Sequence, residues 1–180
     1  EKDKMIAITI FSQFLLYISL ALLMGTFILS CIPSSLRPQL FISPKWLIVS
    51  AVSLPVVSFV PNIQLLSILT PQFGLIDSIW MLLSKFKVGH SWLAIVCFTI
   101  ILMLIVQMYQ KQQSILSAVM GIVVLMAIMA AIGYISHAGS MSGIVGSIFD
   151  FVHLLAVSVW LGILILISFF SKDAANWEAY

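Results

Sequence analysis

Residues 115 to 135 read ILSAVMGIVVLMAIMAAIGYI and contain no charged side chain. A bilayer core of roughly 30 Å requires about 20 apolar residues in a helix, so this stretch is long enough to cross a membrane. Four other intervals between charged residues are equally long, and the 180-residue chain is 62% hydrophobic and only 8% charged. The composition therefore predicts a membrane protein rather than a soluble domain.

The apolar runs predict an all-α fold, a polytopic transmembrane helical bundle of about five spans plus one interfacial helix. We expect residues 1–180 to form a single integral membrane domain, because no internal repeat or low-complexity tract divides the chain. Residues 72–86 are too charged to cross lipid but carry apolar side chains at helical spacing, which is typical of an interfacial helix. The expected spans are residues 5–32, 46–69, 90–108, 115–135 and 148–171.

Two local patterns add detail to this bundle. Pro55 and Pro61 fall inside the second span, where each removes a backbone hydrogen bond, so we expect a bend there. Small residues recur at three- and four-residue spacing over 127–133 of the fourth span, which allows close helix approach. We therefore expect the fourth span to lie at the centre of the bundle.

Charge and motif content exclude several classes of function. The formal charge is +2, from eight Lys and Arg against six Asp and Glu, and no basic run suggests nucleic acid as a partner. Cys31 and Cys97 belong to no metal-binding pattern, so we interpret them as apolar fillers. The chain lacks GxSxG, Walker and HExxH motifs, so we expect no enzyme. Its main environment is expected to be the lipid bilayer.

The polar residues concentrate near the fifth span. Asp150 and His153 stand three residues apart, which places them on one helical face. An ionisable residue within a membrane is costly, so the pair suggests a functional site. The alternative is structural: Asp150 would favour the helix N-terminus and His153 would extend to the interface.

Further candidate ligands surround this pair. His137 ends the fourth span, and the Gly- and Ser-rich connection that follows could fold back to bring His137 and Met141 near His153. Imidazole suits copper, thioether sulfur favours Cu(I), and Asp150 could orient an imidazole or exchange protons. The set therefore points to copper. His90, at the head of the third span on the same side, is a possible outer ligand, or simply an interfacial anchor.

The strings HAGSM, from residue 137, and DFVHLLAVSVWLG, from residue 150, resemble the signature of the CopD family of bacterial copper-resistance membrane proteins, which includes the membrane portion of CopC-CopD fusions. The resemblance covers about 25 residues strongly, and the rest of the chain more loosely or in hydropathy alone. One departure is Ile163, where the family often has a second glycine. The signature residues of this sequence are His137, Asp150, His153, Trp160 and Gly162.

The resemblance implies a protein of the bacterial inner membrane that takes copper from a periplasmic CopC-like domain and moves it toward the cytoplasm. It also implies that the N-terminus and the His137 loop are extracytoplasmic. Because the chain starts at Glu1 rather than Met, and the family bundle is larger than five spans, we expect a fragment of a longer bundle.

Two alternatives from other classes remain open. In the first, His137 and His153 on adjacent helices bind a b-type haem as axial ligands, which would make the chain an electron-transfer protein. In the second, the chain is a structural membrane subunit whose histidines merely reach the interface. A visible absorption spectrum distinguishes the haem protein, and loss of copper on histidine replacement distinguishes the copper site from the structural role.

Overall fold

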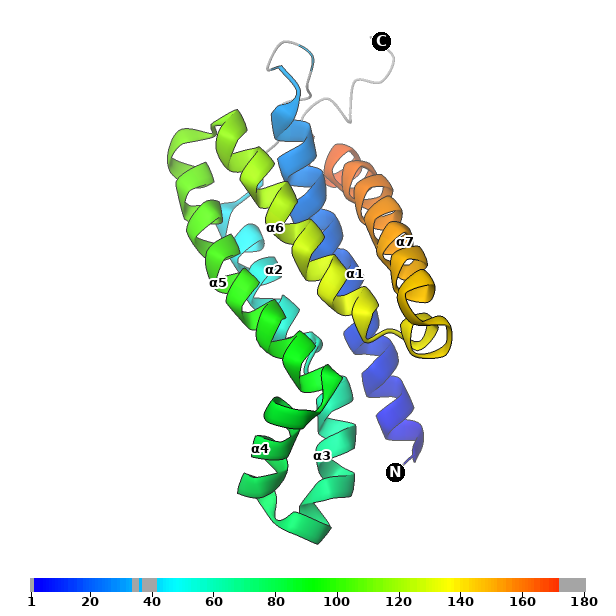
Figure 1. The fold of residues 1–180 in the computed structure, drawn as a ribbon. Helices are drawn as coiled ribbons and strands as arrows, with labels where there is room; N and C mark the ends of the chain where they lie inside the picture. The colour runs from blue at the N-terminus through cyan, green and yellow to red at the C-terminus, as the bar shows by residue number, and fades with distance from the viewer. Residues whose placement is uncertain (1, 34–35, 37–41, 172–180) are drawn as a thin grey trace.

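The structure is a computed structural model that describes residues 2–33, 36 and 42–171; at positions 2, 3, 5, 137, 138 and 140 it describes only the backbone. The described residues form seven helices, so the predicted all-α fold is confirmed (Figure 1). The helices are α1 (Lys2–Cys31), α2 (Pro44–Val57), α3 (Val60–Phe73), α4 (Leu75–Lys85), α5 (Lys87–Gln112), α6 (Ile115–Tyr134) and α7 (His137–Phe170).

Five stretches are helical, long and apolar enough to cross a membrane, as the sequence predicts. The second of them joins α2 and α3 into one span, whereas the others lie within single helices. The protein is thus a multi-pass membrane protein. The candidate spans are Ile6–Cys31, Pro44–Phe73, Lys87–Gln112, Ile115–Tyr134 and Met141–Phe170.

The bend expected at the two prolines separates α2 from α3 at residues 58 and 59. Trp92 of α5 supports this break, because its indole N–H donates to the carbonyl of Pro55 at 2.9 Å. Its ring also packs on Phe59, with centroids 4.8 Å apart. A side chain from a neighbouring helix thus satisfies a carbonyl that the broken helix leaves without its usual backbone donor.

The most buried helix is α1, not α6. In α1, 67% of the most apolar stretch is buried, against 33% in α6. α1 packs against α7, α2 and α6, and Leu20, Leu23, Met24 and Phe27 are fully buried. The expectation that the fourth span is central is therefore wrong. Small residues let α6 approach its neighbours closely, but they do not determine how many neighbours surround it.

The connection between the fourth and fifth spans is helical rather than a loop. α7 begins at His137, directly after Ser136, whose Oγ accepts a hydrogen bond from the Gly139 N–H at 3.0 Å. The helix is interrupted only at Gly143, where φ is 63° and ψ is −138°. Residues with a Cβ rarely adopt this conformation, so glycine permits the kink that redirects the chain into the span.

The helix expected over residues 72–86 is α4, which forms a hairpin with α3 beyond the start of α5 (Figure 1). Ser78 and Leu82 are buried, whereas Ile76 and Trp80 are 82% and 72% exposed. One face of α4 thus packs on the protein and the other presents apolar side chains outward, as an interfacial helix would. Its location at a membrane surface stays a prediction.

Candidate functional site

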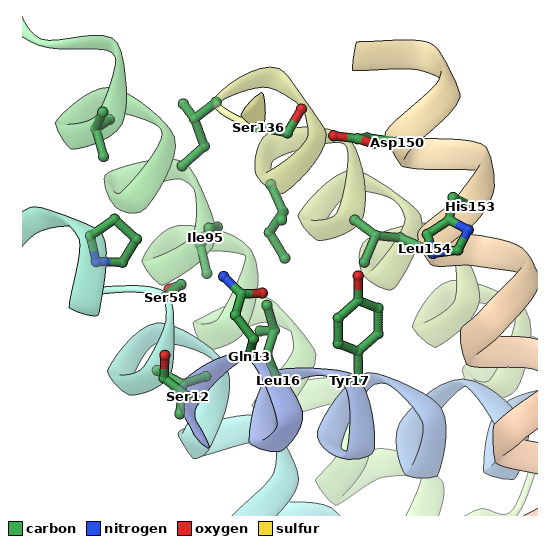
Figure 2. A pocket seen from close by; sticks show the side chains of 15 residues that line it. Ser12, Gln13, Leu16, Tyr17, Ser58, Ile95, Ser136, Asp150, His153 and Leu154 are labelled. Carbon is green, nitrogen blue, oxygen red and sulfur yellow. The ribbon is translucent and has the colours of Figure 1, made fainter. Parts of the chain in front are cut away.

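A cavity of about 320 Å³ lies among residues 12–17 of α1, the first part of α5, the end of α6 and residues 150–154 of α7. Its walls come from α1, the α2–α3 break, α5, the end of α6 and α7 (Figure 2). Among the described residues that line it, Asp150 is the one charged side chain, and no Lys or Arg is present. A cavity with one carboxylate and no fixed positive charge suits a cation.

The α7 wall contains the two residues that the sequence analysis placed on one helical face. Asp150 and His153 both line the cavity; Asp150 is half-buried and His153 is exposed. Neither forms a hydrogen bond or an ion pair with another residue that the structure describes. No described residue therefore competes with a ligand for these two side chains.

The opposite wall is formed by Gln13 and Tyr17 of α1, whose side chains extend into the cavity (Figure 2). They stand four residues apart, so they share a face of the helix. Within the described part of the chain, neither has a hydrogen-bond partner. The sequence analysis did not include them in the site. The available signal was two polar side chains at helical spacing in an otherwise apolar span.

Three serines also line the cavity, but the backbone engages each of them. Ser12 Oγ and Ser58 Oγ donate to backbone carbonyls 2.8 and 3.2 Å away, and Ser136 Oγ is the cap at the start of α7. Four polar side chains that line the cavity have no hydrogen bond among the described residues: Gln13, Tyr17, Asp150 and His153.

The other predicted ligands lie elsewhere or are not described. Met141 is 75% exposed and is not part of the cavity lining. His90 also lies outside the lining, with its Nε2 3.1 Å from the carbonyl oxygen of Ser84. The side chain of His137 lies outside the described residues, although its backbone follows Ser136 at the cavity wall. Their roles as ligands stay predictions. In the described residues, no three His, Cys, Asp or Glu side chains gather into a metal cluster.

The cavity is confined to one end of the bundle. From His153 to the end of α7 at Phe170 the helix rises about 25 Å, close to the thickness of a bilayer core. Farther along α1 than the cavity, Leu20, Met24 and Phe27 are fully buried. The site thus lies to one side of a packed apolar core, toward the start of α5 and the end of α6.

The position of α7 against α1 depends on two glycines. A Cβ at Gly25 would lie 2.6 Å from the carbonyl carbon of Gly162, and a Cβ at Gly162 would meet the carbonyl oxygen of Ala21. Only glycine at both positions allows this approach. Ile163 stands at the position where the family that the sequence resembles often has a second glycine. Its side chain packs beside the buried Leu22 and Leu166. Isoleucine at this position therefore does not line the cavity.

The fold and the site define a class: a helical, multi-pass membrane protein with an internal cavity that contains a carboxylate and an imidazole. The family described as copper resistance protein D-like, N-terminal domain, matches residues 4–148. The chain belongs to this family, which connects it with copper. No curated protein and no solved structure matched the chain. The family match ends just before Asp150 and His153, so the role of these two residues rests on their geometry.

Proposed function

We propose that this chain is a copper-binding protein of the bacterial inner membrane. It receives copper from a periplasmic CopC-like donor and moves the ion toward the cytoplasm, without catalysing a chemical reaction. One observation carries the proposal: in a chain of a copper-resistance family, Asp150 and His153 line a cavity with no protein partner among the described residues.

The chemistry of the cavity supports a copper ion as the cargo. Imidazole nitrogen is a good copper ligand, and a carboxylate supplies either charge or proton exchange when the ion enters or leaves. In this proposal His153 binds the ion, Asp150 orients His153 or accepts a proton, and His137 adds a second imidazole. Met141 and His90, outside the cavity lining, serve as a capture point and an outer ligand.

The proposed direction of transfer places the cavity on the extracytoplasmic side. Copper then enters near residues 150–153 of α7. Farther along α1 it meets packed side chains, including those of Leu20 and Phe27. These residues close the path in this conformation, so the transfer requires a second state in which the core opens. The driving force comes from an ion gradient or from a partner protein.

Copper binding by the detergent-purified protein tests the proposal. His153→Ala should lower copper affinity at least about tenfold, because a ligand is lost. His90→Ala should cost at most a few-fold, because the proposal makes His90 an outer ligand outside the cavity lining; the difference between the two variants measures the part of the cavity in binding. Stoichiometric copper that survives a His137→Ala/His153→Ala double substitution would overturn the site. An intense Soret band in the purified protein would instead identify haem.

Sidedness has its own test. A single cysteine at Ser136, in a background with Cys31 and Cys97 replaced by Ser, should react with a membrane-impermeant thiol reagent added to the periplasmic side of spheroplasts. Ser136 lines the cavity, so the reaction reports which face the cavity is on. Labelling only after the cytoplasmic side is exposed would contradict the proposed orientation.

A further inference from the structure

Two facing helices contribute equally to the four cavity side chains that have no partner in the described part of the chain. Gln13 and Tyr17 come from α1, and Asp150 and His153 come from α7 (Figure 2). Gln13 and His153 are exposed, whereas Tyr17 and Asp150 are half-buried. A polar group without a partner in an apolar bundle is costly to the extent that it is removed from water. Four such groups on opposite walls of one cavity are what a site for a shared ligand requires.

The described residues that line this cavity offer nitrogen and oxygen as donor atoms. Among its described lining residues there is no Met or Cys, and Met141 lies outside. Thioether and thiolate sulfur select Cu(I), whereas imidazole, carboxylate and carbonyl groups suit divalent ions, and Cu(II) prefers a tetragonal set of nitrogen and oxygen ligands. The cavity therefore differs in chemistry from the His and Met set that the sequence suggests.

We infer that the cavity is a Cu(II) site completed by α1. Gln13 supplies its side-chain carbonyl oxygen as a ligand, and Tyr17 is a positioning residue whose hydroxyl donates a hydrogen bond to water bound on the ion. His153 supplies the nitrogen ligand from α7, and Asp150 keeps the orienting or proton-accepting role that the proposed function gives it. This inference rests on the proposed copper function and adds to it the oxidation state of the ion and the second helix of the site.

The glycine contact between the helices supports the pairing of the two walls. Gly25 and Gly162 hold α1 and α7 together at backbone distance, which fixes the register of the two helices relative to each other. In that register Gln13 and Tyr17 face the same cavity as Asp150 and His153. A fixed register of the two helices lowers the entropy cost of bringing side chains from both walls to one ion.

Titration of the full chain in detergent with Cu(II), followed by electron paramagnetic resonance, tests the inference. The parent should show a tetragonal Cu(II) signal with nitrogen coupling from His153. Gln13→Leu should change the parallel g and copper hyperfine values and weaken Cu(II) binding about tenfold or more, whereas Gln13→Glu, which keeps an oxygen donor, should restore binding. Tyr17→Phe should weaken binding about tenfold while nitrogen coupling persists.

Ser12→Ala is the matched control, because Ser12 lies on the same helix and lines the same cavity but its hydroxyl is bonded to the Thr9 carbonyl. It should leave the spectrum and the affinity unchanged. Ag(I), a redox-stable substitute for Cu(I), should not displace Cu(II) at tenfold excess. Displacement by Ag(I), or indifference to both α1 substitutions, would overturn the inference. Absence of any copper in the parent would overturn the proposed function itself.

Discussion

α1 and α7 meet in two different ways along one interface. Around Gly25 and Gly162 the backbones touch, and no side chain separates them. About 13 Å nearer the start of α7, around His153, the same two helices face each other across the cavity. They run in the same direction, so both kinds of contact belong to one continuous pairing (Figure 1).

The two ends of this interface have different roles: the glycine end holds the helices together, and the cavity end contains groups that can bind a ligand. Lipid tails are as apolar as the helices, so association in a membrane depends on close contact, which the two glycines provide. The cavity end contains four polar side chains that have no partner among the described residues. Substitutions at the glycine end should therefore change stability, and substitutions at the cavity end should change ligand binding.

The largest effect is expected for Gly162→Leu. Its side chain would collide with the backbone of α1 at Ala21, which cannot move without separating the helices. We expect a loss of about 3 kcal/mol or more, or failure to yield a monodisperse protein. Thermal unfolding in detergent measures it. Ala156→Leu, at an exposed position of the same helix, is the control and should leave Tm nearly unchanged.

A second test concerns the packed apolar core around Phe27, which lies farther along α1 than the cavity. Phe27 is fully buried, packs edge-on against Tyr109 with ring centroids 5.5 Å apart, and occupies the space that Gly121 leaves open. Phe27→Ala should cost about 3 kcal/mol because it leaves a void, while copper affinity is retained. Thermal unfolding and copper titration measure the two effects. Phe169→Ala, at an 80% exposed position, is the control.

The same contact allows a double-mutant cycle. Gly121→Ala alone should destabilise the protein, since its Cβ would lie 2.5 Å from the Phe27 ring. In the Phe27→Ala background the same change should be neutral or stabilising. Additive effects of the two substitutions would contradict the contact between these residues.

A smaller effect is expected at the kink of α7. Gly143 has a positive φ, and a Cβ there would meet no atom within 4 Å, so the cost of Gly143→Ala comes from the backbone alone. We expect about 1–2 kcal/mol from forcing this conformation on alanine. Thermal unfolding measures it, and Ser142→Ala, at the neighbouring exposed position, is the control. Equal Tm values for both variants would mean that the kink is not required.

Hydropathy predicted the spans because each helix must satisfy its backbone internally and present about 20 apolar residues to lipid. The pairing of Asp150 with His153 on one face followed from helical periodicity alone. Both predictions depend on local sequence. They required no knowledge of which helices are neighbours.

Two features could not be predicted from the sequence, because they depend on tertiary packing: which helix is most buried, and which α1 residues line the cavity. All five spans are similarly apolar, so nothing local indicated that α1 is the most buried helix or that Gln13 and Tyr17 face Asp150 and His153. The Gly- and Ser-rich stretch after His137 has the composition of a loop, yet one glycine conformation and a serine cap allow it to remain mostly helical. Flexible composition therefore did not indicate irregular structure.

The smallest effect on stability, and the one that best sharpens the comparison, is expected for Asp150→Asn. The carboxylate has no partner among the described residues, so removing its charge should raise the free energy of unfolding by about 1 kcal/mol. Copper affinity should nevertheless fall about tenfold, because Asp150 is the one charged side chain among the described residues that line the cavity. Unfolding and titration of the same sample measure both effects. Asp77→Asn, exposed on α4 and outside the cavity lining, should change neither. A variant that loses stability while keeping its copper would show that Asp150 belongs to the packing of α7, and that the division between the two ends of the interface is wrong.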